Sequence, residues 1–310
     1  MDCRMRAFVF PDDLQPLKRL IQACWAADSI DVLPMFVLRL WLTPGSFMAL
    51  EGLELGEDTA LWSGAGGGIA AFAFINPKSL ELRFYIHPQH GTAQLEDEVV
   101  GWAQRRAEAL SPDGSGRLKC PSVREDARQR ALLLRHGFAP GDSYMIRMSR
   151  ALSAPLPVVK PPPGFSLGTL AHRRQVPAYV DLINELFPHS RATTEVVQGT
   201  CELPHIFNWI ASAADGRFAA FCQAYIDVPE EAFAPVGWTD PLGTRQAFRR
   251  KGLARAVIAT ALADLKERGM EEAVLVTNCE NEGGQRLYQG LGYRVLYHTH
   301  TYTKGLQTQG

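Results

Sequence analysis

The chain has 310 residues, of which 46% are hydrophobic and 21% charged, and its formal net charge is −1. That length is typical of two domains rather than one. A near-neutral charge gives no reason to expect a nucleic-acid or anionic-membrane partner, and no apolar run approaches the ~20 residues that a membrane span needs. The six cysteines are scattered without a CxxC pair, which favours buried free thiols. We therefore expect a cytoplasmic protein with no nucleic-acid or membrane partner.

Apolar patterning in the first half predicts strands followed by helices. The strands are expected at about Thr59–Trp62, Ile69–Ile75 and Leu80–Ile86, and the helices at Gln94–Leu110 and Ala127–His136. The glycine-rich run Gly64–Gly68 lies between two strands rather than before a helix. It therefore predicts a flexible hairpin turn and not a dinucleotide-binding loop.

A proline-rich segment divides the chain near its middle. Ala151–Gly164 contains Pro161-Pro162-Pro163 and two further prolines, and such a run cannot continue a helix or a central strand. An extended, semi-rigid linker is therefore expected here.

The second half repeats the order of elements found in the first. We expect extended residues from Phe165, a helix around Val176–Phe187, strands at Ile206–Ala213 and Arg217–Val228, an extended run Val236–Thr244, a helix Gly252–Arg268, a strand Glu272–Thr277, a short helix Gly283–Leu291 and a strand Tyr293–Tyr302. The pair Gly137-Phe138 matches Gly292-Tyr293, with a longer loop at Ser111–Gly116 in the first copy. A shared order of elements with one small length difference predicts an internal duplication: one domain over 1–150, a linker over 151–163 and a second domain over 164–310.

The segment Asp240–Ala256 (DPLGTRQAFRRKGLARA) joins an extended run to an amphipathic helix through a basic loop. Unpaired N–H groups at a helix N-terminus attract anions, and the small residues Gly252 and Ala254 let an anion approach closely. Cations are supplied by Arg245, Arg249, Arg250, Lys251 and Arg255, without an acid from Arg245 through Ala263. The pattern favours a pyrophosphate-binding loop; a solvated basic loop that caps the helix is the alternative.

Three motifs in order resemble the GNAT superfamily of acyl-CoA-dependent N-acetyltransferases. Arg249-x-x-Gly252-x-Ala254 resembles its Q/R-x-x-G-x-G/A loop, and Asp240-Pro241-Leu242-Gly243-Thr244 resembles the preceding E-P-V-G-T strand. The segment Asn281–Gly292 resembles N-x-x-A-x-x-L-Y-x-x-L-G. The resemblance covers about residues 164–304. It implies a mixed α/β (α+β) fold of two tandem GNAT-like domains, each a twisted, mostly antiparallel sheet flanked by helices.

The resemblance also implies a site that uses acetyl-CoA as co-substrate and an amine as acceptor. In it Tyr288 is the general acid and Asp240 the general base, with Glu230, Glu231 and Asp227 in reserve. The coenzyme is expected on Leu242, Gly243, Thr244, Arg249, Arg250, Lys251, Gly252, Leu253, Ala254, Arg255 and Asn281, although Asn281 is also suited to capping its helix. The histidines and cysteines form no cluster with the spacing of metal ligands, so we expect no metal. His298, His300 and Tyr302 share one strand face and are assigned a structural role.

The first copy departs from the motif at each functional position. Gln94 and Glu96 align with Gly252 and Ala254, while Leu82, Leu133 and Asp126 take the base, tyrosine and asparagine positions. Acids at a helix start repel a pyrophosphate, so we expect the first domain to be degenerate.

The expected activity is transfer of an acetyl group to a primary amine of a small molecule, by direct attack without an acyl-enzyme, in a monomer or homodimer. The alternatives are a non-catalytic acyl-CoA sensor, a mycothiol synthase-like enzyme and a protein-directed acetyltransferase.

Overall fold

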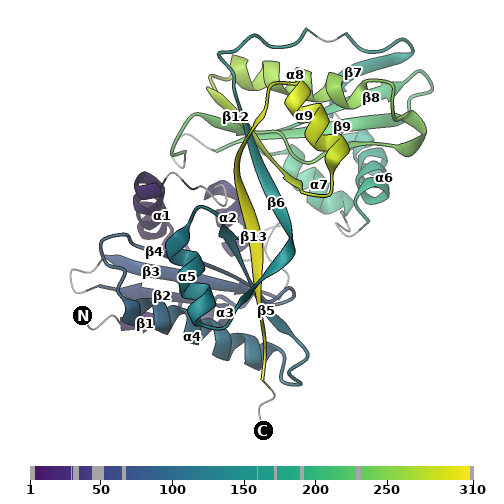
Figure 1. Cartoon of the computed structure of the whole chain (residues 1–310). Coiled ribbons are helices and arrows are strands. Elements are labelled where there is room, and N and C mark those ends of the chain that lie inside the picture. The colour runs from purple at the N-terminus through teal and green to yellow at the C-terminus, as the bar shows by residue number, and fades with distance from the viewer. Residues whose placement is uncertain are drawn as a thin grey trace. The chain divides into compact units, whose positions relative to one another are not determined.

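The computed structural model describes residues 4–28, 30, 35–43, 52–64, 68–158, 160–170, 173–188, 192–227 and 232–307. No helix within these ranges is long and apolar enough to cross a membrane. The chain folds into two compact units, Met1–Met145 with Tyr297–Gly310 (unit 1) and Ile146–Leu296 (unit 2) (Figure 1). The domain boundaries expected from the sequence follow chain order, whereas unit 1 is assembled from both ends of the chain.

Unit 1 contains a sheet with strand order β1-β2-β3-β4-β5-β13. Its strands are β1 (Arg4–Arg6), β2 (Thr59–Ser63), β3 (Ile69–Asn76), β4 (Glu81–Ile86), β5 (Arg117–Val123) and the last residues of β13 (Arg294–Gly305). Its helices are α1 (Leu14–Asp28), α2 (Met35–Leu42), α3 (Leu55–Asp58), α4 (Ala93–Leu110) and α5 (Ala127–Arg135).

Alternation along β3 places a helical layer on each face of this sheet. Ala71, Ala73 and Ile75 belong to a core formed with Val99 and Trp102 of α4, among others. The intervening residues face the other way, where Phe72 contacts Phe8 and Phe74 contacts Trp41 of α2. Burial of β3 on both faces explains its nearly continuous apolar sequence.

Unit 2 contains a sheet with strand order β6-β12-β10-β9-β8-β7, and β11 pairs with β9. The strands are β6 (Ala139–Ala151, its last residues in unit 2), β7 (Phe165–Thr169), β8 (Ile206–Ala213), β9 (Phe218–Ile226), β10 (Val236–Trp238), β11 (Leu242–Thr244) and β12 (Glu272–Asn278). The helices are α6 (Val176–Leu186), α7 (Thr194–Cys201), α8 (Leu253–Glu267) and α9 (Glu282–Gly290), with 3₁₀ turns at Arg173–Gln175 and Gln246–Phe248.

Helices also cover both faces of the unit 2 sheet. Ile210 and Phe221 pack with Tyr179 and Leu182 of α6. Trp209, the neighbour of Ile210, points the other way and donates its indole N–H to Asp264 of α8 at 3.2 Å. The mixed α/β fold with helix-flanked sheets agrees with the sequence prediction, and Trp238 is buried in unit 2.

The two units exchange strands. In unit 1, β13 pairs antiparallel with β5 from Thr299↔Val123 to Gly305↔Arg117, although β13 follows unit 2 in the chain. Tyr302 of β13 is buried in the unit 1 core. In return, residues from Ile146 onward in β6, which follows unit 1 in the chain, belong to unit 2. Each sheet is therefore completed by a strand from the other half of the sequence.

Matching local geometry supports the predicted duplication. The side chain of Asp126 caps α5 by accepting the Gln129 N–H at 2.8 Å, and Asn281 caps α9 by accepting the Gly284 N–H at 3.1 Å. Each helix ends in a glycine with positive φ, at Gly137 and Gly292. Such caps need the left-handed conformation that glycine adopts without strain.

One sequence expectation was wrong in detail and several elements were missed. The run Val236–Thr244 is not one strand, because β10 and β11 are separated around Asp240 and only β10 pairs with β12. The sequence analysis assigned neither the helices α1, α2, α3 and α7 nor the strands β1, β5 and β6, whereas the extended residues expected from Phe165 correspond to β7. Several of these are short or carry charged residues, and their stability comes from sheet pairing and packing rather than from local pattern. The hairpin turn is consistent with the antiparallel pairing of β2 and β3; residues 65–67 of the turn lie outside the described residues.

The strand exchange predicts that the first half of the sequence cannot fold fully by itself. A fragment of residues 1–150 lacks β13 and exposes the pairing edge of β5 together with part of the unit 1 core. We expect a broad, weakly cooperative thermal transition that a synthetic peptide of residues 294–307 sharpens and raises, measured by circular dichroism. A scrambled peptide is the control, and a fragment that unfolds cooperatively at the same temperature without the peptide would contradict the prediction.

Candidate active site

The site is organised by the point at which two parallel strands part. β10 and β12 pair from Val236↔Glu272 to Trp238↔Val274, and the last ladder bond runs from the Thr239 N–H to the Val274 carbonyl at 2.9 Å. Beyond it the chain turns to β11, which pairs only with β9 among the described strands. The edge of β11 that faces away from β9 is therefore unpaired.

Hydrogen bonding shows which groups of β11 lie on that open edge. The Gln223 N–H donates to the Pro241 carbonyl at 3.0 Å and the Arg245 N–H to the Ala219 carbonyl at 2.9 Å. Because antiparallel partners alternate, the N–H groups of Leu242 and Thr244 point away from β9. The N–H of Gly243 faces β9 instead. An extended ligand can therefore pair with Leu242 and Thr244 as an added strand would.

The N-terminus of α8 lies just beyond β11 and is not capped by a side chain. Gly252 is the N-cap with φ +83°, and no side chain accepts a hydrogen bond from the first turn. The first intrahelical donor is the Ala256 N–H, to the Gly252 carbonyl at 3.0 Å. The preceding N–H groups, including those of Leu253 and Ala254, carry the positive end of the helix dipole. The loop offers an anion several convergent donors.

The basic residues of this loop differ in the groups that they contact. Arg250 makes no hydrogen bond or ion pair within the described part of the chain, and the Lys251 ammonium lies 5.6 Å from the Phe248 ring centre. Arg249 donates to the Thr244 carbonyl at 3.2 Å. Arg255 donates to the Gly290 carbonyl at 3.2 Å, and Arg245 pairs with Glu185. Arg245 is thus paired with an acid, whereas the remaining cations of the loop are not neutralised by an acid of the described residues: Arg249, Arg250, Lys251 and Arg255.

Asp240 lies where β10 ends, and its carboxylate replaces the missing ladder contacts. Its Oδ2 accepts the Val276 N–H at 3.3 Å, and its Oδ1 accepts the Tyr225 hydroxyl at 3.2 Å. Burial raises the pKa of Asp240 to about 6, against the opposing effect of the Val276 and Tyr225 hydrogen bonds and the Arg147 charge. The group is therefore ionised at neutral pH but basic enough to take a proton.

The sequence analysis missed Arg147, which reaches this carboxylate from β6. Its guanidinium lies 4.3 Å from the ring centre of Trp238, and Trp238 stacks on Tyr225 at 5.6 Å with an interplanar angle of 11°. The charge of Arg147 lowers the pKa of Asp240. An arginine between Ile146 and Met148 was the available signal, since such a charge is seldom buried without a partner. The exchanged strand thus contributes a residue to the neighbourhood of Asp240.

Tyr288 is buried on α9 near the same carboxylate. Only 7% of its surface is exposed, and its ring lies 6.1 Å from that of Tyr293. Burial, with the nearby Cys222 and Asp240, raises the pKa of Tyr288 above its usual range. Its hydroxyl is therefore protonated at neutral pH and can act as a proton donor.

Asn281 uses both ends of its amide within the chain. Besides capping α9, it donates from Nδ2 to the Thr277 hydroxyl at 3.0 Å. It therefore ties the end of β12 to the start of α9, the helix that carries Tyr288.

Unit 1 differs most from unit 2 at the start of the corresponding helix. Thr92, rather than Gln94, occupies the N-cap position of Gly252, and its hydroxyl accepts the Leu95 N–H at 3.2 Å. Glu96 forms ion pairs with Arg128 at 2.7 Å and Arg135 at 3.4 Å. The Arg128 guanidinium also covers Gly91, where an added Cβ would lie 2.1 Å from Nη2. The anion-binding position is thus capped, acidic and covered.

The remaining predicted residues lie outside this arrangement. Tyr144 stacks on His300 at 5.0 Å and contacts His298 edge-on at 5.2 Å, all within unit 1. The reserve bases Glu230 and Glu231 lie outside the described residues. Burial is the largest cause of the raised pKa of Tyr225, and the charge of the third reserve base, Asp227, raises that pKa further. Among the described residues no cluster of His, Cys, Asp and Glu is suited to a metal ion.

Comparison with known proteins agrees with this geometry. The profile of the acetyltransferase (GNAT) family matches residues 176–293. A mycothiol acetyltransferase of Thermomonospora curvata is 26% identical over 81% of this chain and 84% of its own length. The type 1 aminoglycoside N(6′)-acetyltransferase of Serratia marcescens is 30% identical over 32% of this chain and 72% of its own length.

Solved structures resemble the chain over nearly its whole length. A GCN5-related N-acetyltransferase from Sphaerobacter thermophilus matches with a TM-score of 0.74 and 24% identity, covering 98% of this chain and 95% of its own. A tandem GNAT protein from the clavulanic acid biosynthesis pathway matches with a TM-score of 0.72 and 13% identity, covering 98% of both chains.

The chain belongs to the GNAT acetyltransferase family and is an N-acetyltransferase. Its overall fold is similar to that of a tandem GNAT protein.

The position of Arg147 predicts that its charge helps to lower the pKa of Asp240, against the larger effect of burial. Arg147→Met keeps an aliphatic stem near Trp238 but removes the charge, so we expect the Asp240 pKa to rise above its value in the unmodified chain. Arg147→Lys retains the charge and should leave the midpoint closer to that of the wild type. Carboxyl ¹³C NMR titration measures the pKa directly, and equal midpoints in the wild type and Arg147→Met would refute the coupling.

Proposed function

We propose that the chain transfers an acetyl group from acetyl-CoA to a primary amine of a small molecule. Members of this family use acetyl-CoA with an acceptor, and the end of the β10–β12 pairing is the observation that carries the proposal for this chain. Beyond it the Leu242 and Thr244 N–H groups are unpaired among the described strands and the chain continues to the uncapped start of α8, so we expect one elongated ligand to use both.

The residues present suit such a ligand. Its pyrophosphate would contact the first-turn N–H groups of α8, from Gly252 to Arg255, with countercharge from Arg249, Arg250 and Lys251. Its amide-containing arm would pair with the open edge of β11, as an added strand does. Bound there, acetyl-CoA supplies an activated thioester.

The side chains around the parting point then divide the proton transfers between them. Asp240 accepts the proton of the ammonium group, directly or through one water, and the neutral amine attacks the thioester carbon. A C–N bond forms as the C–S bond breaks. Tyr288 donates its proton to the departing sulfur, the excess proton leaves the acylated nitrogen and the Tyr288 hydroxyl is reprotonated, and no acyl-enzyme is needed. The N–H of Leu242 or Thr244 would donate to the carbonyl oxygen on which charge develops.

The acceptor is proposed only as a primary amine of a small molecule. The names of two relatives suggest classes of acceptor to test. One is a mycothiol acetyltransferase, and the other is an aminoglycoside N(6′)-acetyltransferase. The full chain should therefore be assayed for thiol release from acetyl-CoA against a panel of amines of both classes, with polyamines and lysine-bearing peptides. Amine-dependent thiol release supports the proposal. Tight binding of acetyl-CoA without release for any amine would favour the sensor function instead.

Tyr288→Phe should lower turnover by about 10²–10⁴-fold, the usual contribution of general acid catalysis. The ring and its packing on Tyr293 are kept, so the affinity for coenzyme A should be little changed. Steady-state kinetics with an active amine and calorimetric titration with coenzyme A measure the two effects separately. Turnover within about threefold of wild type would be too small for an acid role.

Each chain should bind one acetyl-CoA, in unit 2. Gly252→Asp should abolish this binding because a carboxylate would enter the anion-binding loop. The fold should survive, since the added Cβ would meet no atom closer than Pro162 Cγ at 3.9 Å and the left-handed backbone at φ +83° costs about 1–2 kcal/mol for a residue type that adopts it on occasion. Thr92→Asp is the matched control in unit 1, where aspartate also caps a helix well. Native mass spectrometry should find one coenzyme in wild type and Thr92→Asp and none in Gly252→Asp; two coenzymes per wild-type chain would contradict the prediction.

A further inference from the structure

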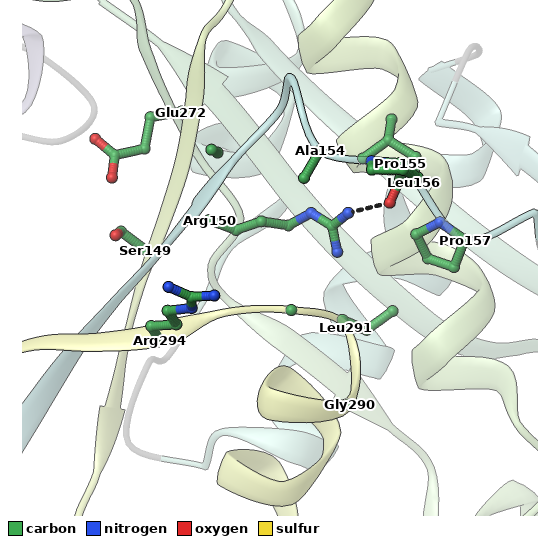
Figure 2. Close-up of a pocket in the computed structure, with 12 residues that line it drawn as sticks. Ser149, Arg150, Ala154, Pro155, Leu156, Pro157, Glu272, Gly290, Leu291 and Arg294 are labelled. Carbon is green, nitrogen blue, oxygen red and sulfur yellow. Dashed lines mark hydrogen bonds between the residues drawn. The ribbon is translucent and has the colours of Figure 1, made fainter.

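Unit 2 contains a cavity of about 810 Å³ that the proposed acetyl transfer does not use. It is lined by the end of β6, the proline-rich segment, the start of β12 and the chain that follows α9 (Figure 2): Ser149, Arg150, Pro155, Glu272, Gly292 and Arg294 are among its residues. The volume lies within the range of roughly 300–1,000 Å³ that is typical of small-molecule sites.

The most unusual side chain in this cavity is Arg150. Only 6% of its surface is exposed, yet it forms no ion pair with an acid among the described residues. Its Nη2 donates to the Pro155 carbonyl at 2.6 Å, while its buried Nε has no partner. A buried guanidinium is unfavourable unless a negative group neutralises it. Arg150 thus carries a charge that the described part of the chain does not balance.

Gly292 makes room for this guanidinium. A Cβ at position 292 would lie 2.8 Å from Nη1 of Arg150, and Gly292 also has a φ of +89°. The end of α9 supplies a partial negative charge of about one half at this point, which offsets Arg150 only in part.

The rest of the lining adds one further cation and one acid. Arg294 is exposed at the start of β13 and lines the same cavity, near Arg150 in Figure 2. Glu272 is the acidic residue of the lining, and the Ser149 hydroxyl is also present. Two arginines against one carboxylate and a weak dipole leave the cavity with a net positive charge.

This cavity is separate from the site described above. None of the residues proposed to bind the coenzyme or transfer protons lines it. Along β12, Glu272 precedes the Asp240-bound Val276 by four residues, which is about 13 Å of extended chain. Along β6, Arg150 lies three positions after Arg147. Because successive side chains of a strand alternate, the two arginines lie on opposite faces.

We propose that this cavity is a second ligand site, which binds a small anion through phosphate or carboxylate oxygens held by Arg150 and Arg294. Guanidinium groups match both kinds of oxyanion through paired hydrogen bonds. The tandem architecture creates the site, because β6 and the proline-rich segment come from the first half and linker while β12 and α9 come from the second copy. The proposal does not depend on the acetyltransferase site.

The test is an NMR titration of the full chain with inorganic phosphate and, separately, with acetate, at constant ionic strength. The amide signals of Gly290 and Gly292 report on the cavity, and that of Gly252 reports on the coenzyme loop. We expect saturable shifts of Gly290 and Gly292 with at least one probe; the tighter-binding probe identifies the ligand as a phosphate or a carboxylate.

Variants of the exposed Arg294 and the half-buried Glu272 decide the outcome, because neither side chain belongs to the buried core. Arg294→Gln should weaken binding about tenfold, as expected for loss of one charge-assisted hydrogen bond, and Glu272→Gln should tighten it roughly threefold by removing a like charge. Arg286→Gln on α9 removes an exposed arginine outside the cavity and should change nothing. A response confined to Gly252, no response to either probe, or wild-type affinity in Arg294→Gln would overturn the proposal.

Discussion

The ladder between β10 and β12 ends at the hydrogen bond from the Thr239 N–H to the Val274 carbonyl. From that point the backbone must satisfy its polar groups in another way, and Asp240 does so by accepting the Val276 N–H. The same divergence frees one edge of β11 and directs the chain to the start of α8. The open strand edge, the helix terminus and a basic carboxylate thus follow from one interruption of a parallel strand pair.

The exchange of β6 and β13 explains why a degenerate domain is retained. Unit 1 has the helix that corresponds to α8, but Thr92 caps it and Glu96 holds Arg128 over its start. What the first half supplies instead is structural, because β6 completes the unit 2 sheet and carries both Arg147 and Arg150. One of these arginines stacks beside the proposed base and the other lines a separate cavity. The first half of the sequence therefore contributes to unit 2 as well as to unit 1.

Much of unit 2 could be predicted because its local signals agree with its tertiary environment. The strand Ile206–Ala213 and the helix after Gly252 have clear apolar periodicity. Gly269 follows the end of α8, and Asn281 marks the start of α9. The break around Asp240 could not be predicted, since Val236–Thr244 has a continuous extended pattern and only pairing distinguishes its two parts. The early helices and β6 were missed because packing, rather than intrinsic propensity, makes them form.

The sequence alone determined the duplication, the family resemblance and the residue types at the proposed site. These properties depend on the order and spacing of residues along the chain, which can be recognised without knowledge of tertiary contacts. Only the tertiary structure decided which half completes which sheet, which cations of the loop are already paired, and that Arg147 lies against Trp238. Those are contacts between segments far apart in the chain, and a strand's composition does not specify its partner. For this protein, the physical limit of sequence analysis is strand pairing.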